Sequence, residues 1–422
     1  MKLFKVLLPS LLATLLAPLS FAASISGSVI DATTRAPLAG AFVSLGGNNT
    51  RTDKNGAFRI EGDGTELRAR AYGHLRNAVT MSNGSLAPVI ELKPFTPKAV
   101  YLSTYGIGSL KLRNAALEAI DKSQLNTLVI DLKTDSAIIG YKSAVPLAAE
   151  IGAQKIITVR DMPAQIAALH EQGIYTIARI VTFKDNLLAR AKPELAVKNQ
   201  SGGIWQDREG LAWVDPFKRE VWDYNLALAE EAAKMGFDEV QFDYVRFPDT
   251  RGLVFSKPNT EQNRVETISG LLAAARAKLA PYNVFLSADV FGYVCWNLND
   301  TEIGQRLDEL AANVDYLSPM LYPSGFQFGI PGYRNPVANS YEIIYRSLER
   351  ARVRSGLEAS RFRPWLQAFR DYAFDRRQFG ADEIQDQIRA AEKFGSGGWM
   401  LWNPRNVYSL EAIQPTTKTA GN

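Results

Sequence analysis

The chain has 422 residues, of which 46% are hydrophobic and 22% are charged, a composition typical of folded globular proteins and not of disordered ones. This length exceeds what one ordinary hydrophobic core needs, so we expect one small and one large domain. The formal net charge of +4 is too small to indicate a nucleic-acid partner.

Residues 1–22 have the pattern of a secretory signal peptide. Lys2 and Lys5 give a basic start, a leucine-rich run follows, and Ser20 and Ala22 are small residues placed before a cleavage site. The apolar run is too short to span a membrane comfortably. We therefore expect an exported protein, periplasmic or extracellular, without membrane insertion. The only cysteine, Cys295, excludes an internal disulfide.

Residues 23–95 alternate short strand-like runs with turns rich in Gly, Asn and Asp, which predicts a small antiparallel β-sandwich. Strands are expected at Ile25–Ile30, Ala41–Leu45, Ala57–Ile60, Leu67–Tyr72 and Val89–Leu92. The runs Gly27–Asp31, Pro37–Val43 and Thr52–Phe58 resemble the carboxypeptidase regulatory-like, transthyretin-related sandwich. In that family the module is an accessory domain or spacer, so the resemblance implies no catalytic role.

A different pattern follows Pro94 and Pro97, because residues 96–410 alternate strand-like runs with amphipathic helical segments. Eight strands are expected: Val100–Ile107, Thr127–Leu132, Tyr175–Thr182, Val240–Phe247, Val284–Phe291, Val314–Leu321, Pro364–Phe369 and Gly398–Trp402. This alternation predicts an α/β fold, a closed (β/α)8 TIM barrel. Residues 411–422 would form a C-terminal tail.

The strand expected at Val240–Phe247 is unusual because Gln241, Asp243 and Arg246 interrupt it. A strand buried on both faces of a parallel sheet should be almost wholly apolar. One explanation is a structural ion pair between Asp243 and Arg246 or another basic group. The other is a catalytic role, because TIM-barrel enzymes place their reactive residues at the carboxyl ends of strands.

Other expected strands repeat this pattern. Side chains alternate along a strand, so the face that carries each polar residue can be followed. The polar groups expected on the same side of the barrel are Asp131, Lys133, Arg179, Gln241, Asp243, Ser287, Asp289 and Gln367. So many converging groups indicate a polar pocket.

Several kinds of catalytic site are disfavoured by the histidine content. His74 and His170 are the only two histidines, too few for the usual zinc sites or a Ser-His-Asp arrangement in the barrel. Four acids could instead hold a hard cation: Asp131, Asp135, Asp243 and Asp289.

Cleavage of a glycosidic bond needs two carboxyl groups and neither histidine, metal nor cofactor. Asp243 and Asp289 end neighbouring expected strands, so they could flank one bond. Arg179 and Lys133 would keep one carboxylate ionised, and an apolar setting would keep the other protonated. This hypothesis fails if either acid is held in a salt bridge beneath the rim or points away from the opening.

Aromatic residues gather at or after the strand ends, where they could stack on sugar rings. The residues expected to bind a polysaccharide or oligosaccharide in this way are Trp205, Trp213, Tyr244, Tyr322 and Trp402. A non-catalytic carbohydrate-binding or cell-envelope scaffold protein stays an alternative. It would keep the aromatic rim without needing the two acids close together.

Longer motifs support the same interpretation: Lys184–Asp185, Trp213–Pro216, Val221–Tyr224, Gly236–Pro248, Tyr322–Ser324, Arg363–Gln367 and Gly398–Asn403. Through them residues 99–408 resemble a glycoside hydrolase barrel family of unassigned specificity, found in exported bacterial proteins and distantly similar to α-amylase barrels. The resemblance implies Asp243 as nucleophile and Asp289 as proton donor. The chain departs from the amylase pattern in having Asp289 where Glu is usual and Gln367 where Asp is usual.

Overall fold

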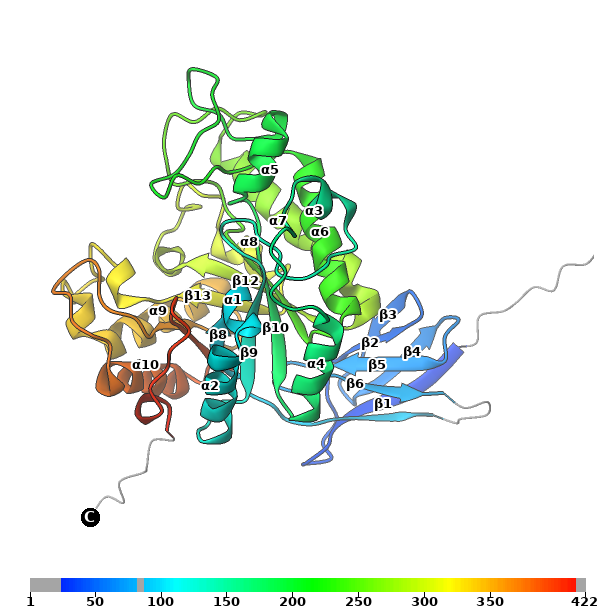
Figure 1. The fold of residues 1–422 in the computed structure, drawn as a ribbon. Helices are drawn as coiled ribbons and strands as arrows, with labels where there is room; N and C mark the ends of the chain where they lie inside the picture. Colours follow the sequence, from blue (N-terminus) through cyan, green and yellow to red (C-terminus); the bar gives the residue numbers. More distant parts are fainter. Residues whose placement is uncertain (1–23, 82–86, 415–422) are drawn as a thin grey trace, which may run out of the picture.

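The structure is a computed structural model that describes residues 24–81 and 87–414. The expected signal peptide and most of the expected tail lie outside the described residues. Two small sheets come first along the chain, and a closed barrel surrounded by helices follows them (Figure 1).

The two small sheets pack face to face. One has the order β4-β1-β7, and the other has the order β3-β2-β5-β6. Their strands are β1 Ser24–Asp31, β2 Phe42–Leu45, β3 Asn48–Arg51, β4 Ala57–Glu61, β5 Glu66–Arg70, β6 Asn77–Thr80 and β7 Val89–Leu92. Val29 and Phe58 of the first sheet share one apolar core with Val43 and Leu67 of the second. The pairing of β1 with β7 is parallel, which differs from the all-antiparallel expectation.

The barrel strands close in the order β10-β11-β12-β13-β14-β15-β8-β9, and this confirms the predicted TIM barrel. Their bounds are β8 Lys98–Leu102, β9 Thr127–Lys133, β10 Tyr175–Val181, β11 Glu239–Asp243, β12 Phe285–Phe291, β13 Tyr316–Met320, β14 Trp365–Gln367 and β15 Trp399–Trp402. Val240 and Phe242 of β11 pack in the cluster shared with the helices. Gln241 lies on the opposite face, inside the barrel, where it bonds to Ser318.

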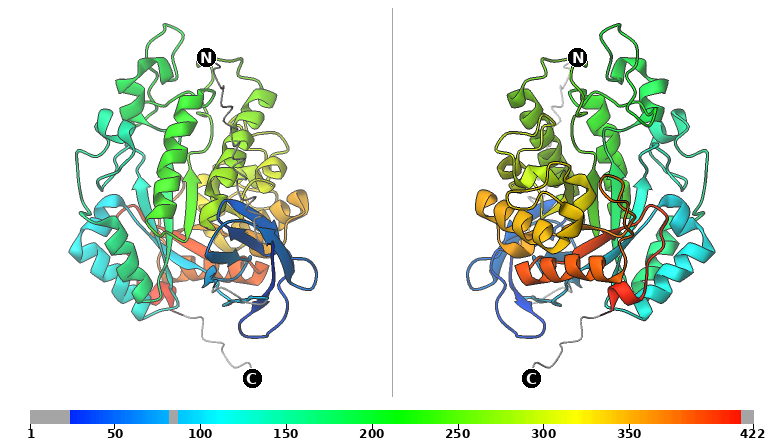
Figure 2. Two further views of the ribbon diagram at one scale, coloured as in Figure 1. Left: turned by 90° about the vertical axis from the view of Figure 1, so that its right-hand side faces the viewer. Right: turned by 90° about the vertical axis from the view of Figure 1, so that its left-hand side faces the viewer.

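Helices cover the outside of the barrel (Figure 2). They are α1 Thr104–Gly108, α2 Leu110–Asp121, α3 Pro146–Glu150, α4 Met162–Glu171, α5 Asn186–Ala191, α6 Arg219–Lys234, α7 Glu261–Leu279, α8 Leu307–Ala311, α9 Ser340–Ser355 and α10 Ala381–Phe394. The strand predicted to reach Ile107 ends at Leu102 instead, because the Ser103 side chain accepts from the Gly106 N–H and caps α1. No helix in the described part of the chain is long and apolar enough to span a bilayer.

The small sheets contact the barrel at the end where its strands begin. Arg70 of β5 forms a buried ion pair of 3.0 Å with Asp315, the residue before β13. Arg76 pairs with Asp238, the residue before β11, at 3.2 Å. The carboxyl ends of the barrel strands therefore remain open on the opposite side of the molecule.

Candidate active site

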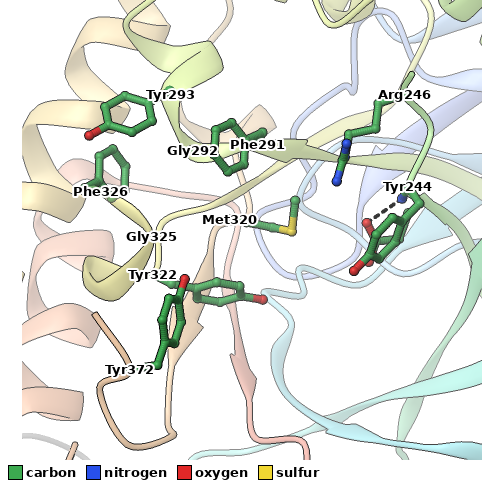
Figure 3. Close-up of a pocket in the computed structure, with 11 residues that line it drawn as sticks. Tyr244, Arg246, Phe291, Gly292, Tyr293, Met320, Tyr322, Gly325, Phe326 and Tyr372 are labelled. Carbon is green, nitrogen blue, oxygen red and sulfur yellow. Dashed lines mark hydrogen bonds between the residues drawn. The ribbon is translucent and has the colours of Figure 1, made fainter. Parts of the chain in front are cut away.

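Asp243 is the last residue of β11 and lies in the wall of a cavity at the carboxyl end of the barrel. Figure 3 shows this cavity. The cavity has a volume of about 190 Å³. Its other lining residues are Tyr244, Arg246, Phe291, Gly292, Tyr293, Met320, Tyr322, Gly325, Phe326 and Tyr372. Asp243 is thus the one carboxylate among the described lining residues, in a wall that is otherwise mostly aromatic.

Arg179 on the neighbouring strand β10 joins Asp243 to Asp131. Its Nε donates to Asp243 Oδ2 at 3.0 Å, and its Nη1 donates to Asp131 Oδ1. The Tyr101 hydroxyl donates to the other oxygen of Asp131. One buried guanidinium therefore fixes two buried carboxylates. Within the described residues no group of three or more His, Cys, Asp or Glu is placed to hold a metal ion.

The ion pair of Asp243 is thus with Arg179 and not with Arg246. Both partners are almost wholly buried, with Asp243 4% exposed, although Asp243 does line the cavity. Tyr244, the next residue, has a φ of 47°, a left-handed conformation that is rare for a bulky residue. Its N–H donates to Asp243 Oδ1 at 2.5 Å. Strain of this kind clusters at functional sites, and here it ends β11 four residues before the predicted end.

Asp289 lies on the adjoining strand β12, and its side chain is 1% exposed. Its Oδ1 accepts a hydrogen bond of 2.8 Å from Trp365 Nε1, and its Oδ2 is buried without a described hydrogen-bond partner. Burial raises the pKa of the Asp289 carboxyl well above its usual range, and the charge of Asp243 raises it further. The site therefore holds one paired carboxylate and one carboxyl that favours its protonated form.

Three aromatic side chains hold these groups in place. Trp402 stacks on Tyr101 with ring centroids 3.9 Å apart and meets Trp365 edge to face at 5.5 Å. The guanidinium of Arg179 lies 4.8 Å from the Trp402 ring centroid. Trp402 therefore packs against the charged cluster while it stays half-buried, and it is not among the residues that line the cavity.

A second hollow of about 540 Å³ adjoins the cavity, and Tyr244 and Arg246 line both. Trp205 and Trp213 line this groove, with their ring centroids 6.4 Å apart. Trp213 is also edge-on to Tyr244 at 5.6 Å. Three of the predicted sugar-contacting aromatics thus lie together along a path that leads to Asp243.

Lys133 is placed elsewhere, so its predicted position in the pocket is wrong. The register of β9 against β10 shifts after Asp131, so that Lys133 pairs with Ile180. Its ammonium group is buried outside the barrel and donates at 2.8 Å to both Asp185 and Asn225. A β-bulge of this kind turns a side chain to the other face.

The remaining predicted residues lie either in the cavity wall or deeper inside the barrel. Tyr322 lines the cavity. Gln241 lies inside the barrel and donates to Ser318 Oγ at 3.3 Å. Gln367 is fully buried and bonds to the backbone N–H and the hydroxyl of Ser324. Gln241 and Gln367 therefore stabilise the barrel around the site, and neither lines the cavity.

Several lining residues were not predicted. Met320 ends β13, and Phe326 and Tyr372 lie in the loops that follow β13 and β14. Of these three residues, only Met320 could have been predicted from the sequence, because it lies at the end of an expected strand. Phe326 and Tyr372 could not have been predicted, because the periodicity of strands does not indicate the path of a loop.

Comparisons with known proteins agree with this architecture. Residues 99–408 match the family model described as "Putative glycosyl hydrolase domain". The glycoside hydrolase domain of PgaB (BpsB) from Bordetella bronchiseptica is 12% identical, with 76% of this chain and 99% of that chain covered and a TM-score of 0.54.

Two further solved structures also match. A hypothetical protein from Ruminiclostridium thermocellum is 38% identical, with 45% of this chain and 97% of that chain covered and a TM-score of 0.41. The spore cortex-lytic enzyme SleL of Bacillus cereus is 13% identical, with 90% and 88% covered and a TM-score of 0.45. No curated protein matches the chain.

Proposed function

The chain belongs to the family of the putative glycosyl hydrolase domain, and from this premise we propose that it hydrolyses glycosidic bonds of a polysaccharide with Asp243 and Asp289. One observation carries the proposal. A carboxylate in the wall of an aromatic cavity adjoins, on the next strand, a buried carboxyl that favours its protonated form. These are the two forms of carboxyl group that cleavage of an acetal requires.

Asp243 is the proposed nucleophile. Arg179 pairs with its charge, and the Tyr244 N–H fixes the direction of its carboxylate. Attack on the anomeric carbon would form a covalent glycosyl intermediate while the bond to the leaving oxygen breaks. The proton for that oxygen comes from Asp289. In the second half, Asp289 takes a proton from the attacking water, and the bond between Asp243 and the sugar breaks.

The proposed donor role requires movement of the cavity wall. Asp289 is 1% exposed and does not line the cavity. Tyr322 does line it, two residues after Met320, which pairs in register with Trp365, the residue whose indole donates to Asp289. Entry of a sugar beside Tyr322 would therefore give the leaving oxygen access to the Asp289 proton.

The purified full chain should release reducing ends from at least one member of a panel of bacterial and plant polysaccharides. With the export expected from residues 1–22, envelope and extracellular polymers are the first to test, and N-terminal sequencing of the periplasmic protein would check the cleavage. Binding of a polymer without release of reducing ends would instead favour the non-catalytic scaffold.

Asp289→Asn is expected to be inactive yet stable. Asn has the shape of a protonated Asp and can still accept from Trp365, but its amide protons are not acidic, so it cannot protonate a leaving oxygen. Because the pKa of Asp289 is raised in the folded state, wild-type stability should fall as the pH rises from about 3.9 to the folded-state pKa. The stability of the Asp289→Asn variant should not fall over this pH range.

Chemical unfolding of both proteins between pH 4 and pH 9, with rates measured in parallel, checks this prediction. The wild-type rate should decline once the pH passes the folded-state pKa of Asp289, since the donor then loses its proton. An Asp289→Asn variant that keeps the wild-type rate would show that Asp289 is only structural.

A further inference from the structure

Arg246 is the one cation that lines the cavity beside Asp243, among the residues described there. It lies three residues after Asp243, and it also lines the adjoining groove. In Figure 3 its guanidinium extends from the rim toward the space between Phe291, Met320 and Tyr244. Any sugar bound between the groove and the nucleophile would pass this group.

The guanidinium of Arg246 is held in position but uses few of its donors. Its carbon Cζ lies 5.0 Å from the Trp213 ring centroid and 5.3 Å from that of Tyr244. Its Nη1 donates to the backbone oxygen of Phe247 at 3.0 Å, the one hydrogen bond that it makes to a described residue. It forms no ion pair with any described carboxylate. Most of its five N–H donors therefore remain free.

The other charges of the groove are engaged or exposed. Lys184 pairs with Asp207 at 3.1 Å and with Glu209 at 2.6 Å. Arg208 and Asp249 are exposed and do not line the cavity. Arg246 is thus half-buried along this path, and no described acid forms an ion pair with it.

From this arrangement, and resting on the proposed function, we propose that the substrate is an acidic polysaccharide whose sugars carry a carboxylate, and that Arg246 binds this carboxylate. A guanidinium matches a carboxylate through two parallel N–H···O bonds. One free cation balances one carboxylate, whereas a phosphate monoester would bring more charge than Arg246 offers. An acidic sugar beside Asp243 would be repelled by its carboxylate, and Arg246 offsets that repulsion.

Binding tests this inference independently of turnover. The full-length Asp243→Asn variant is titrated with uronic-acid polymers and with the same polymers after chemical reduction of their carboxyl groups to alcohols. A sulfated neutral polymer forms a third arm. We expect each preferred acidic polymer to bind on the order of 10- to 100-fold more tightly than its reduced form, as for hydrogen bonds to a charged group.

Arg246→Gln, added to Asp243→Asn, should abolish the preference for the acidic form. Arg246→Lys should keep part of it, because the charge remains while the planar fork is lost. Arg251→Gln is the matched control, since Arg251 is 87% exposed and pairs with Glu302 outside both hollows; it should keep the full preference.

Three results would overturn the inference: reduced polymers that bind as tightly as acidic ones, a panel in which no uronic-acid polymer binds, and a preference that survives Arg246→Gln. Tighter binding of the sulfated polymer would overturn the choice of carboxylate. If acidic polymers bind through Arg246 but the wild type releases no reducing ends from them, the proposed hydrolysis fails while the binding inference stands.

Discussion

Asp243→Asn is expected to lower kcat by about 10⁴-fold or more, as loss of a catalytic nucleophile does. The amide has the size of the carboxylate but cannot attack the anomeric carbon. Its one amide oxygen can still accept from Arg179, while the Tyr244 N–H loses its acceptor; the side chain keeps its size, so the fold should survive. Initial rates of reducing-end release at saturating polysaccharide, together with the thermal unfolding midpoint, measure both effects.

Asp131→Asn is the matched control for this variant. Asp131 is the other buried carboxylate that Arg179 binds, and it does not line the cavity. It should lower the rate by no more than about 10- to 100-fold, since it acts only by positioning Arg179. Equal losses in the two variants would mean that Asp243 matters only as a partner of Arg179.

A chemical rescue separates a nucleophile from a structural residue. Asp243→Ala leaves space where the carboxylate was, and added azide can occupy it and attack the sugar. We expect azide to restore part of the activity and to yield a glycosyl azide, detected by mass spectrometry. Azide should restore nothing to Asp131→Ala. An Asp243→Asn variant with the wild-type rate would refute the proposed role outright.

The barrel could be predicted because strand and helix periodicities alternate plainly from Val100 to Trp402. Asp243 and Asp289 could be singled out as candidates because a charge in an otherwise apolar strand contradicts burial on both faces. The alternation of faces placed Gln241 and Val240 on the correct sides of β11. These inferences depend on regular backbone, where side-chain direction follows from residue number.

The failures occur where the backbone stops being regular. Lys133 left the predicted face because of the register shift after Asp131. Arg246 was one suggested partner of Asp243, but the positive φ of Tyr244 ends β11 and directs Arg246 over Trp213 instead. Arg179, which was expected to keep one carboxylate ionised, pairs with Asp243 from the neighbouring strand. A bulge and a left-handed residue depend on tertiary contacts, and local sequence patterns do not predict such contacts.

Glu239 shows a different omission. The strand was predicted to begin at Val240, one residue too late, so the buried acid before it was not considered. Glu239 is fully buried and pairs with Arg363 at 2.5 Å. It also accepts from the Tyr175 hydroxyl at 3.0 Å and from Ser287 Oγ at 2.6 Å. This network occupies the barrel interior on the same face of β11 as Asp243.

Arg363→Met is expected to lower the free energy of unfolding by about 3–5 kcal/mol, because it leaves the buried charge of Glu239 without its cation. The guanidinium also lies 3.9 Å from the Tyr316 ring centroid and donates to the Gly397 oxygen at 3.0 Å, and both contacts are lost. Urea unfolding followed by tryptophan fluorescence measures the change.

Arg251→Met makes the same side-chain change at an exposed ion pair and should leave the unfolding midpoint unchanged, since exposed pairs contribute little. Adding Glu239→Gln to Arg363→Met should recover part of the lost stability, because it removes the unpaired charge. Equal midpoints for Arg363→Met and Arg251→Met would contradict the prediction.

Glu239 and Asp243 lie four residues apart on one short strand, so a disturbed interior should also displace the nucleophile. Arg363→Met should therefore slow hydrolysis, although less than Asp243→Asn does.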